Sequence, residues 1–135
     1  MNKEVKEEIK KLIYKWDLRC SVEEFPENSR KDLNYLLYSN QGGLSESLIR
    51  EFQDKLNWTL VAHRQQLSES FIREFQNKLD WNEVSRSQEL SESLVKEFSH
   101  KLDLKKVLNR GFISKEFIEK MNSPIKSRFH IMDLD

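Results

Sequence analysis

The sequence is poor in the residues that interrupt or cross-link a chain. Its 135 residues include three glycines, two prolines and one cysteine. A single cysteine excludes an intramolecular disulfide and favours a reducing compartment. Because helix breakers are so scarce while Glu, Lys, Leu and Arg are common, the composition predicts an all-α protein.

An excess of one charge and long apolar runs are also missing. The 23 basic residues equal the 23 acidic ones, so no overall field draws the chain to DNA, although the balance still allows local patches. No apolar run approaches the roughly 18 residues that span a bilayer. The first residues, MNKEVKEEIKKLIYKW, carry too many charges for a signal peptide. We therefore expect a soluble, cytoplasmic protein with no membrane association.

What the chain does contain is one motif, repeated with a period of 23 residues in units that begin at Leu44, Leu67 and Leu90. Within the middle unit, Phe71 and Phe75 lie on one stripe of an α-helix. Units of fixed period stack, because none can bury its apolar face alone. The middle unit reads LSESFIREFQNKLDWNEVSRSQE, and the positions that are apolar in all three copies are Leu67, Phe71, Ile72, Phe75, Leu79, Trp81 and Val84.

Each unit carries two signals for a helix start. Ser68 precedes the apolar stripe and can cap a first helix of about three turns. Asp80 stands at capping-box spacing from Glu83, and Asn57 and Asp103 occupy its place in the other copies. We predict that each unit consists of a helix, a sharp corner at Asn57, Asp80 or Asp103, and a shorter second helix.

Residues 1–43 precede the first full unit and carry their own helical pattern. A stripe of apolar residues that ends at Trp16 predicts an N-terminal capping helix. The segment SVEEF has Ser21 and Glu24 at capping-box spacing, which predicts a turn or a very short helix. The string DLNYL at 32–36 resembles DWNEV of the middle unit, so this region is expected to end in a partial repeat.

Residues 113–135 repeat the beginning of a unit, with Ser114 at the cap position. Pro124 then falls inside the expected helix and should stop it. A truncated terminal unit suits the end of a finite stack. The predicted fold is all-α, with the three full repeats of residues 44–112 stacked as a small α-solenoid behind the N-terminal capping helix, in one structural domain.

No constellation of residues indicates catalysis or a bound cofactor. His63, His100 and His130 occupy unrelated repeat positions without metal-ligand spacing, and Cys20 lacks a flanking nucleophile signature. The chain contains no P-loop, GxGxxG or HExxH motif. We predict a protein that is not an enzyme and has no cofactor and no metal site.

The tryptophans and the paired charges have structural explanations. Trp58 and Trp81 could stack on nucleic-acid bases, but Leu104 replaces them in the third copy, which favours apolar packing. Glu69 and Arg73 form an i,i+4 pair of a kind that recurs in the other copies. Such pairs favour a solvated, self-neutralised helix face over a ladder of ligand-binding charges.

The second helices differ between copies, whereas the first helices hardly change. Packing explains the constant part, and residues released from packing can drift or adapt to a partner. The variable segments also form a mildly basic side, because they contain few acidic residues. The candidate partner-binding residues on this side are His63, Arg64, Arg86, Lys105, Lys106 and Arg110. We expect the last five to be exposed, while Val61, Val84 and Val107 anchor the helices beneath them.

The string LSESFIREFQNKLDWNEVSRSQ resembles tandem repeats in proteins of bacteriophages, giant DNA viruses and mobile elements of low-GC bacteria, which carry variants of L-S-E-x-F-I-R-E-F-x-x-K-L-x-W-x-x-V/I-S. The resemblance covers residues 44–112, about half of the chain, and the third copy departs from it at Leu104. It implies a helical repeat of viral or mobile-element origin, with no activity attached. By analogy with other short phage proteins, it also implies an inhibitor of a host factor such as a CRISPR effector.

We therefore predict a non-catalytic protein–protein interaction module that binds a host protein in the cytoplasm of the host cell. The alternative is a helical repeat protein that binds nucleic acid through the basic second-helix side. The two hypotheses differ in salt dependence, because phosphate contacts make affinity fall steeply with salt and protein contacts do so less.

Overall fold

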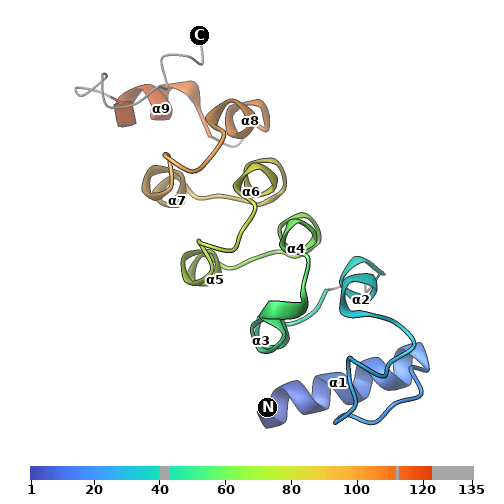
Figure 1. Ribbon diagram of the computed structural model, residues 1–135. Coiled ribbons are helices and arrows are strands. Elements are labelled where there is room, and N and C mark those ends of the chain that lie inside the picture. Colours follow the sequence, from blue (N-terminus) through green and yellow to red (C-terminus); the bar gives the residue numbers. More distant parts are fainter. Residues whose placement is uncertain (40–42, 112, 123–135) are drawn as a thin grey trace. The chain divides into compact units, whose positions relative to one another are not determined.

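The described chain is all-α. The computed structural model describes residues 1–39, 43–111 and 113–122. Residues 121 and 122 are described as backbone only. Within these ranges the chain forms nine α-helices and one short 3-10 helix, without a strand (Figure 1). The prediction of an all-α protein is confirmed. Two compact units can be distinguished, Met1–Leu67 and a second that begins at Ser68, and they are described separately below as unit 1 and unit 2.

In unit 1, helices alternate between two layers (Figure 1). The long helix α1 packs against α3, and α2 packs against α4, so each helix contacts the next but one. Such i, i+2 packing of short helices is typical of helical repeats. The elements are α1 (Lys3–Trp16), α2 (Leu33–Ser39), α3 (Glu46–Glu51), the 3-10 helix η1 (Gln53–Lys55) and α4 (Trp58–Arg64).

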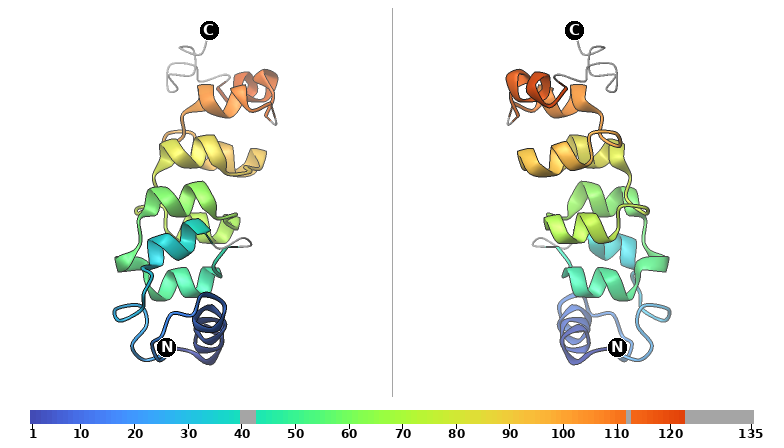
Figure 2. Two further views of the ribbon diagram at one scale, coloured as in Figure 1. Left: turned by 90° about the vertical axis from the view of Figure 1, so that its right-hand side faces the viewer. Right: turned by 90° about the vertical axis from the view of Figure 1, so that its left-hand side faces the viewer.

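Unit 2 repeats this arrangement. Helix α6 packs against α8, and Arg73 of α5 donates through Nε to Glu97 Oε1 of α7 over 2.8 Å. Figure 2 shows these short helices side-on, with their axes roughly aligned. The elements are α5 (Glu69–Glu74), α6 (Trp81–Ser87), α7 (Glu92–Glu97), α8 (Leu104–Asn109) and α9 (Lys115–Asn122).

The predicted helix caps are present. The Phe71 N–H donates to Ser68 Oγ over 3.2 Å, which satisfies one of the free N–H groups at the start of α5. The carboxylate of Asp80 accepts from the Glu83 N–H over 3.2 Å at the start of α6. The equivalent caps of the other helices are Ser45, Asn57, Ser91, Asp103 and Ser114.

The repeated apolar positions form the core. In the middle unit Phe71, Ile72, Phe75 and Val84 are buried, with at most 5% of their surface exposed. Burial of each such side chain contributes about 1.5–3 kcal/mol. Trp81 is the exception at these positions, since it is only half-buried.

The first helices are shorter than the sequence pattern predicts. Helix α5 ends at Glu74, and residues 75–78 continue as a turn in which the Lys78 N–H donates to Phe75 O over 2.9 Å. Two side chains stabilise this turn: the Trp81 indole donates to Gln76 O over 2.8 Å, and the Gln76 amide donates to Arg73 O over 3.0 Å. The prediction of a three-turn first helix is therefore wrong, because these side chains bond carbonyls that a longer helix would use.

The repeat tryptophan therefore donates a hydrogen bond besides packing against its neighbours. In the first copy, Trp58 donates to Gln53 O over 2.9 Å and Gln53 donates to Arg50 O over 3.0 Å, as in the middle copy. The Trp81 ring also packs on Phe98, with centroids 4.8 Å apart. The third copy loses Gln and Trp together, since it has Ser99 and Leu104 at the two places.

The segment after α1 contains the predicted capping box. The Ser21 N–H donates to Glu24 Oε1 over 3.0 Å, and the Glu24 N–H donates to Ser21 Oγ over 3.2 Å. These bonds stabilise the charged carboxylate, so hydrogen bonding from the backbone and side chain of Ser21 lowers the pKa of Glu24. The turn expected in SVEEF is confirmed.

The buried side chain of Gln65 connects the end of α4 to Leu44, the first residue of the first full repeat. The Gln65 side chain accepts from the Leu44 N–H over 3.0 Å and donates to Leu44 O over 2.8 Å. Gly43 allows this approach: its φ is +75°, and a Cβ there would lie 2.6 Å from Gln65 Oε1. The second copy has Gln88 at the same place and buries it too.

The last repeat begins as predicted. Ile113 and Ile118 are buried, and the Phe117 N–H donates to Ser114 Oγ over 3.0 Å. The expected helix stop at Pro124, the tail at 127–135 and the side chain of Met121 lie outside the described residues.

Candidate partner-binding surface

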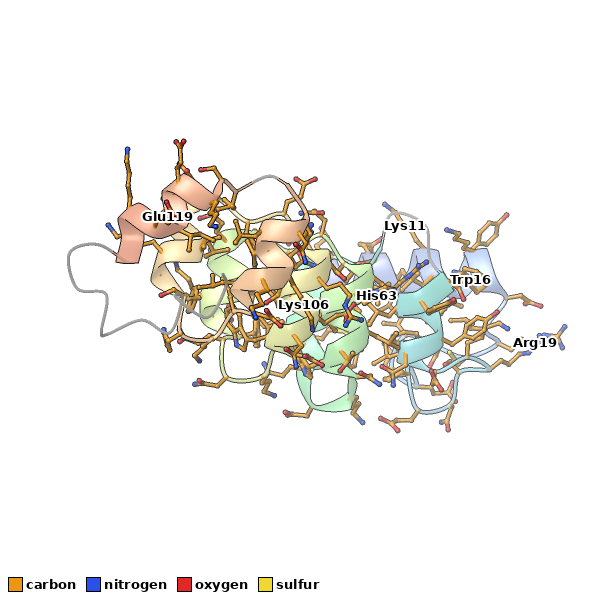
Figure 3. All side chains as sticks on the ribbon, turned by 90° about the horizontal axis from the view of Figure 1, so that it is seen from above. Lys11, Trp16, Arg19, His63, Lys106 and Glu119 are labelled. Carbon is orange, nitrogen blue, oxygen red and sulfur yellow. The ribbon has the colours of Figure 1, made fainter. Side chains whose placement is uncertain are left out.

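The candidate basic residues lie on the second helices, divided between the two units. His63 and Arg64 end α4 of unit 1. In unit 2, Arg86 lies on α6, whereas Lys105 and Lys106 lie on α8. The C-cap of α8 is Arg110. The structure therefore brings together two candidates in unit 1 and four in unit 2, and Figure 3 labels one of each group, His63 and Lys106.

Valines anchor these helices, as expected. Val61, Val84 and Val107 have no exposed surface, which fixes the orientation of α4, α6 and α8. The expected exposure holds for Arg64, Arg86 and Lys105 and is wrong for Lys106 and Arg110, which are half-buried. His63 is exposed as well.

Arg110 is half-buried because it bonds the end of a neighbouring helix. Its Nη1 donates to Ser85 O over 3.3 Å and also to Gln88 O. These carbonyls belong to the end of α6, where helix carbonyls lack partners within the helix. Burial lowers the pKa of the Arg110 guanidinium. A structural role for this residue competes with the predicted role in partner binding.

In unit 1, Arg64 also bonds the carbonyl end of a neighbouring helix. Its Nη2 donates to Tyr38 O over 2.9 Å, at the end of α2, and its guanidinium lies over the Tyr38 ring with Cζ 4.6 Å from the centroid. Arg64 and Arg110 occupy the same place in the repeat, whereas Ser39 and Ser87 occupy it in α2 and α6. In both unit 1 and unit 2, an arginine thus binds the carbonyl end of the preceding second helix.

Two further candidates are paired with carboxylates on their own helices. Arg86 Nη1 lies 3.8 Å from Glu83 Oε2, and Lys106 Nζ lies 3.8 Å from Asp103 Oδ2. Pairs this long at a surface contribute little to stability. They do reduce the positive charge that α6 and α8 offer to a partner.

Sequence reasoning missed the aromatic residues of α2. Leu33, Leu36 and Leu37 are buried, so the opposite side of this helix carries Tyr35 and Tyr38, which are 45% and 55% exposed. Spacing of three residues places the two rings on one face. The signal was present in DLNYLLYS, where leucines alternate with tyrosines at helical spacing.

Cations and a tryptophan surround these tyrosines. Lys31 Nζ lies 4.3 Å from the centroid of the Tyr35 ring, and the Trp16 ring meets Tyr35 edge-on, with centroids 6.2 Å apart. The indole N–H of Trp16 is buried and has no hydrogen-bond partner among the described residues. We call the surface formed by Trp16, Lys31, Tyr35, Tyr38 and Arg64 the tyrosine face.

Other kinds of site find little support in the part of the chain that the structure describes. It contains no group of three or more His, Cys, Asp or Glu side chains that could hold a metal ion. None of its helices has the length and apolar character required to cross a bilayer. Burial and the nearby Glu24 raise the pKa of the Cys20 thiol, which disfavours the reactive thiolate.

Comparison with known proteins gives no relative: no protein-family model matches the sequence, and no curated protein or solved structure matches it either. The resemblance to viral and mobile-element repeats stays a prediction.

Proposed function

We propose that this chain is a non-catalytic protein–protein interaction module that binds through its second helices. In this proposal the repeats stack as a small α-solenoid, with α1 as its N-terminal cap. The i, i+2 packing inside each unit supports the stack, because the same helix pairs recur at the repeat spacing. The variable second helices then supply the surface that differs from one repeat to the next.

The tyrosine face carries this proposal. Residues that dominate protein–protein binding energy are enriched in Tyr, Trp and Arg. Tyr35 and Tyr38 expose about half of their surface, although the same helix buries three leucines beneath them. Tyr35 contacts Trp16 and Tyr38 contacts Arg64, and the surface that these contacts leave exposed can bind a partner.

The basic residues favour a protein over a nucleic acid. Arg64 and Arg110 bond carbonyl groups of their own chain, and Arg86 and Lys106 each lie beside a carboxylate. These contacts reduce the positive charge that the candidate second-helix residues offer to a phosphate backbone, and the release of counterions by such charges drives most nucleic-acid binding. The narrower hypothesis that the partner is a host factor, such as a CRISPR effector, rests on the resemblance to phage repeats.

Affinity capture tests the proposal. The tagged chain is incubated with nuclease-treated lysate of the cells in which the gene occurs, and captured proteins are identified by mass spectrometry. Binding is then repeated with both purified proteins by calorimetry. The test variant changes three exposed second-helix residues to Ser, and the matched control changes three exposed lysines elsewhere: His63, Arg86 and Lys105 against Lys6, Lys78 and Lys96.

We expect a protein partner that the wild type and the control variant bind equally and that the test variant binds at least about tenfold more weakly. Its affinity should depend only mildly on salt. Capture of no protein, together with retention of nucleic acid from a parallel lysate without nuclease and an affinity that falls steeply as salt rises, would contradict the proposal and favour the alternative.

A further inference from the structure

The side chains of the tyrosine face are held by contacts within unit 1. Arg64 is fixed twice, by its bond to Tyr38 O and by its contact with the Tyr38 ring. Lys31 lies over the Tyr35 ring, whose edge-on contact with Trp16 connects α2 to α1. Side chains already held in one conformation lose less entropy on binding. The surface is therefore preorganised.

The charge of this surface is positive. Lys31 and Arg64 contact the two tyrosine rings, and Lys15 lies with its Nζ 5.6 Å from the centroid of the Trp16 ring. Two acids adjoin these residues in sequence: Asp17 is paired with Arg19 and Arg30, and Asp32 accepts the Tyr35 N–H over 2.7 Å at the start of α2. Complementary potentials favour association, so the matching partner surface is acidic.

The geometry favours a peptide over single-stranded nucleic acid. In proteins that bind single-stranded nucleic acid, the bases stack on exposed faces of aromatic side chains. Here Lys31 covers one face of Tyr35, and Arg64 covers one face of Tyr38. Arg64 is exposed and bonds Tyr38 O through Nη2, so its other N–H groups can pair with a carboxylate, and the half-exposed rings offer apolar contact beside it.

We infer that the tyrosine face binds an acidic segment of the partner protein, whose carboxylates pair with Lys31 and Arg64 while an apolar side chain contacts Tyr35 and Tyr38. This inference rests on the proposed protein-binding function and names the chemistry of the partner. The carboxylates would form charge-assisted hydrogen bonds with the two cations.

A selection experiment tests the inference without knowledge of the partner. A random dodecapeptide display library is selected on the immobilised full chain, and enriched peptides are synthesised for fluorescence anisotropy. Two variants probe the surface: Tyr35→Ser with Tyr38→Ser, and Lys31→Glu. Their matched controls are Tyr14→Ser, at a tyrosine of α1 that is 92% exposed, and Lys96→Glu, at an exposed lysine of unit 2 outside the candidate surface. Circular dichroism melts check that each variant folds.

We expect enrichment of peptides that combine Asp or Glu with an apolar residue. Both test variants should weaken their binding about tenfold or more, while both controls bind as the wild type does. Enrichment of neutral or basic peptides, or no enrichment at all, would overturn the inference.

Two further outcomes separate this inference from the proposed function. If acidic peptides bind the tyrosine variant as well as the wild type, the assigned surface is wrong, whereas protein binding as such stands. If oligothymidine displaces the peptides and binds with a steep salt dependence, both the inference and the proposed function are wrong.

Discussion

Replacement of Arg110 by Ala should destabilise unit 2, although this arginine was predicted from sequence to be a surface residue. The change removes the guanidinium that donates to Ser85 O and Gln88 O at the end of α6. Hydrogen bonds with a charged donor contribute about 1.5–3 kcal/mol each. Because the Ser85 bond is 3.3 Å long and Arg110 is half-exposed, we expect a combined loss of about 1.5–3 kcal/mol.

Urea unfolding followed by circular dichroism at the helix band measures this loss. The backbone of Arg110 has φ −79° and ψ −16°, a conformation that Ala adopts without strain, so the side chain alone is tested. Arg110→Lys keeps the charge without the planar fork and should fall between the wild type and Arg110→Ala. Lys105→Ala, on the exposed side of α8, is the control and should stay within about 0.5 kcal/mol of the wild type.

If Arg110→Ala also unfolds within about 0.5 kcal/mol of the wild type, the reasoning is refuted. The two hydrogen bonds would then contribute nothing measurable, and Arg110 would return to the set of cations that a partner can use.

Three further substitutions test the packing and the local hydrogen bonds. Phe75→Ala should lower the free energy of unfolding by about 3–5 kcal/mol, because the Phe75 ring is buried and its centroid lies 4.5 Å from that of the Phe71 ring. A loss below about 1 kcal/mol in urea unfolding would contradict this. Gly43→Ala should lower the free energy of unfolding by about 1–3 kcal/mol in the same assay, since the φ of Gly43 is +75° and the new Cβ meets Gln65. An unchanged urea midpoint would contradict the close approach of Gln65 to Gly43. The pKa of Glu24 is lowered in the folded chain, so its contribution is complete above the unfolded pKa and is lost as pH falls through the folded one. The melting temperatures of wild type and Glu24→Gln should therefore converge in acid, and a difference independent of pH would contradict the capping box.

The features that were predicted correctly depend on residues close together in sequence. The cap at Ser68 involves the N–H three residues later, and the buried stripe of Phe71, Ile72 and Phe75 follows from helical spacing alone. The capping box of Ser21 and Glu24 is local in the same way. Such patterns carry their own geometry, so the sequence suffices to predict them.

The features that were missed depend on which helix packs beside which. Arg110 bonds carbonyls that lie 22 and 25 residues earlier in the chain, and Arg64 reaches back 26 residues to Tyr38. Only the packing of α8 on α6 and of α4 on α2 brings these groups together. The shortened first helix had a partial signal, because Gln76 and Trp81 recur as a pair in one other copy and disappear together in the third.

The candidate surface was predicted in part for the same reason. A comparison of the three full copies directs attention to charges on the second helices, such as Arg86 and Lys105. The partial copy that contains Tyr35 and Tyr38 lies outside the fixed period, because its spacing to the next unit differs by two residues. Its exposed aromatic residues gain significance only once α2 is seen to pack beside α4, with Lys31 and Arg64 over the rings.

Site-specific photo-crosslinking shows whether the tyrosine face contacts a partner protein. A benzophenone amino acid replaces Tyr38, 55% exposed on α2, or, as the matched control, Tyr14, 92% exposed on α1 of the same unit. Each variant is irradiated in the cells in which the gene occurs, and the products are analysed by mass spectrometry. We expect a discrete protein adduct from position 38, joined through an acidic segment of the partner, and none from position 14. A nucleic-acid adduct at position 38, or the same protein adducts from both positions, would contradict this expectation.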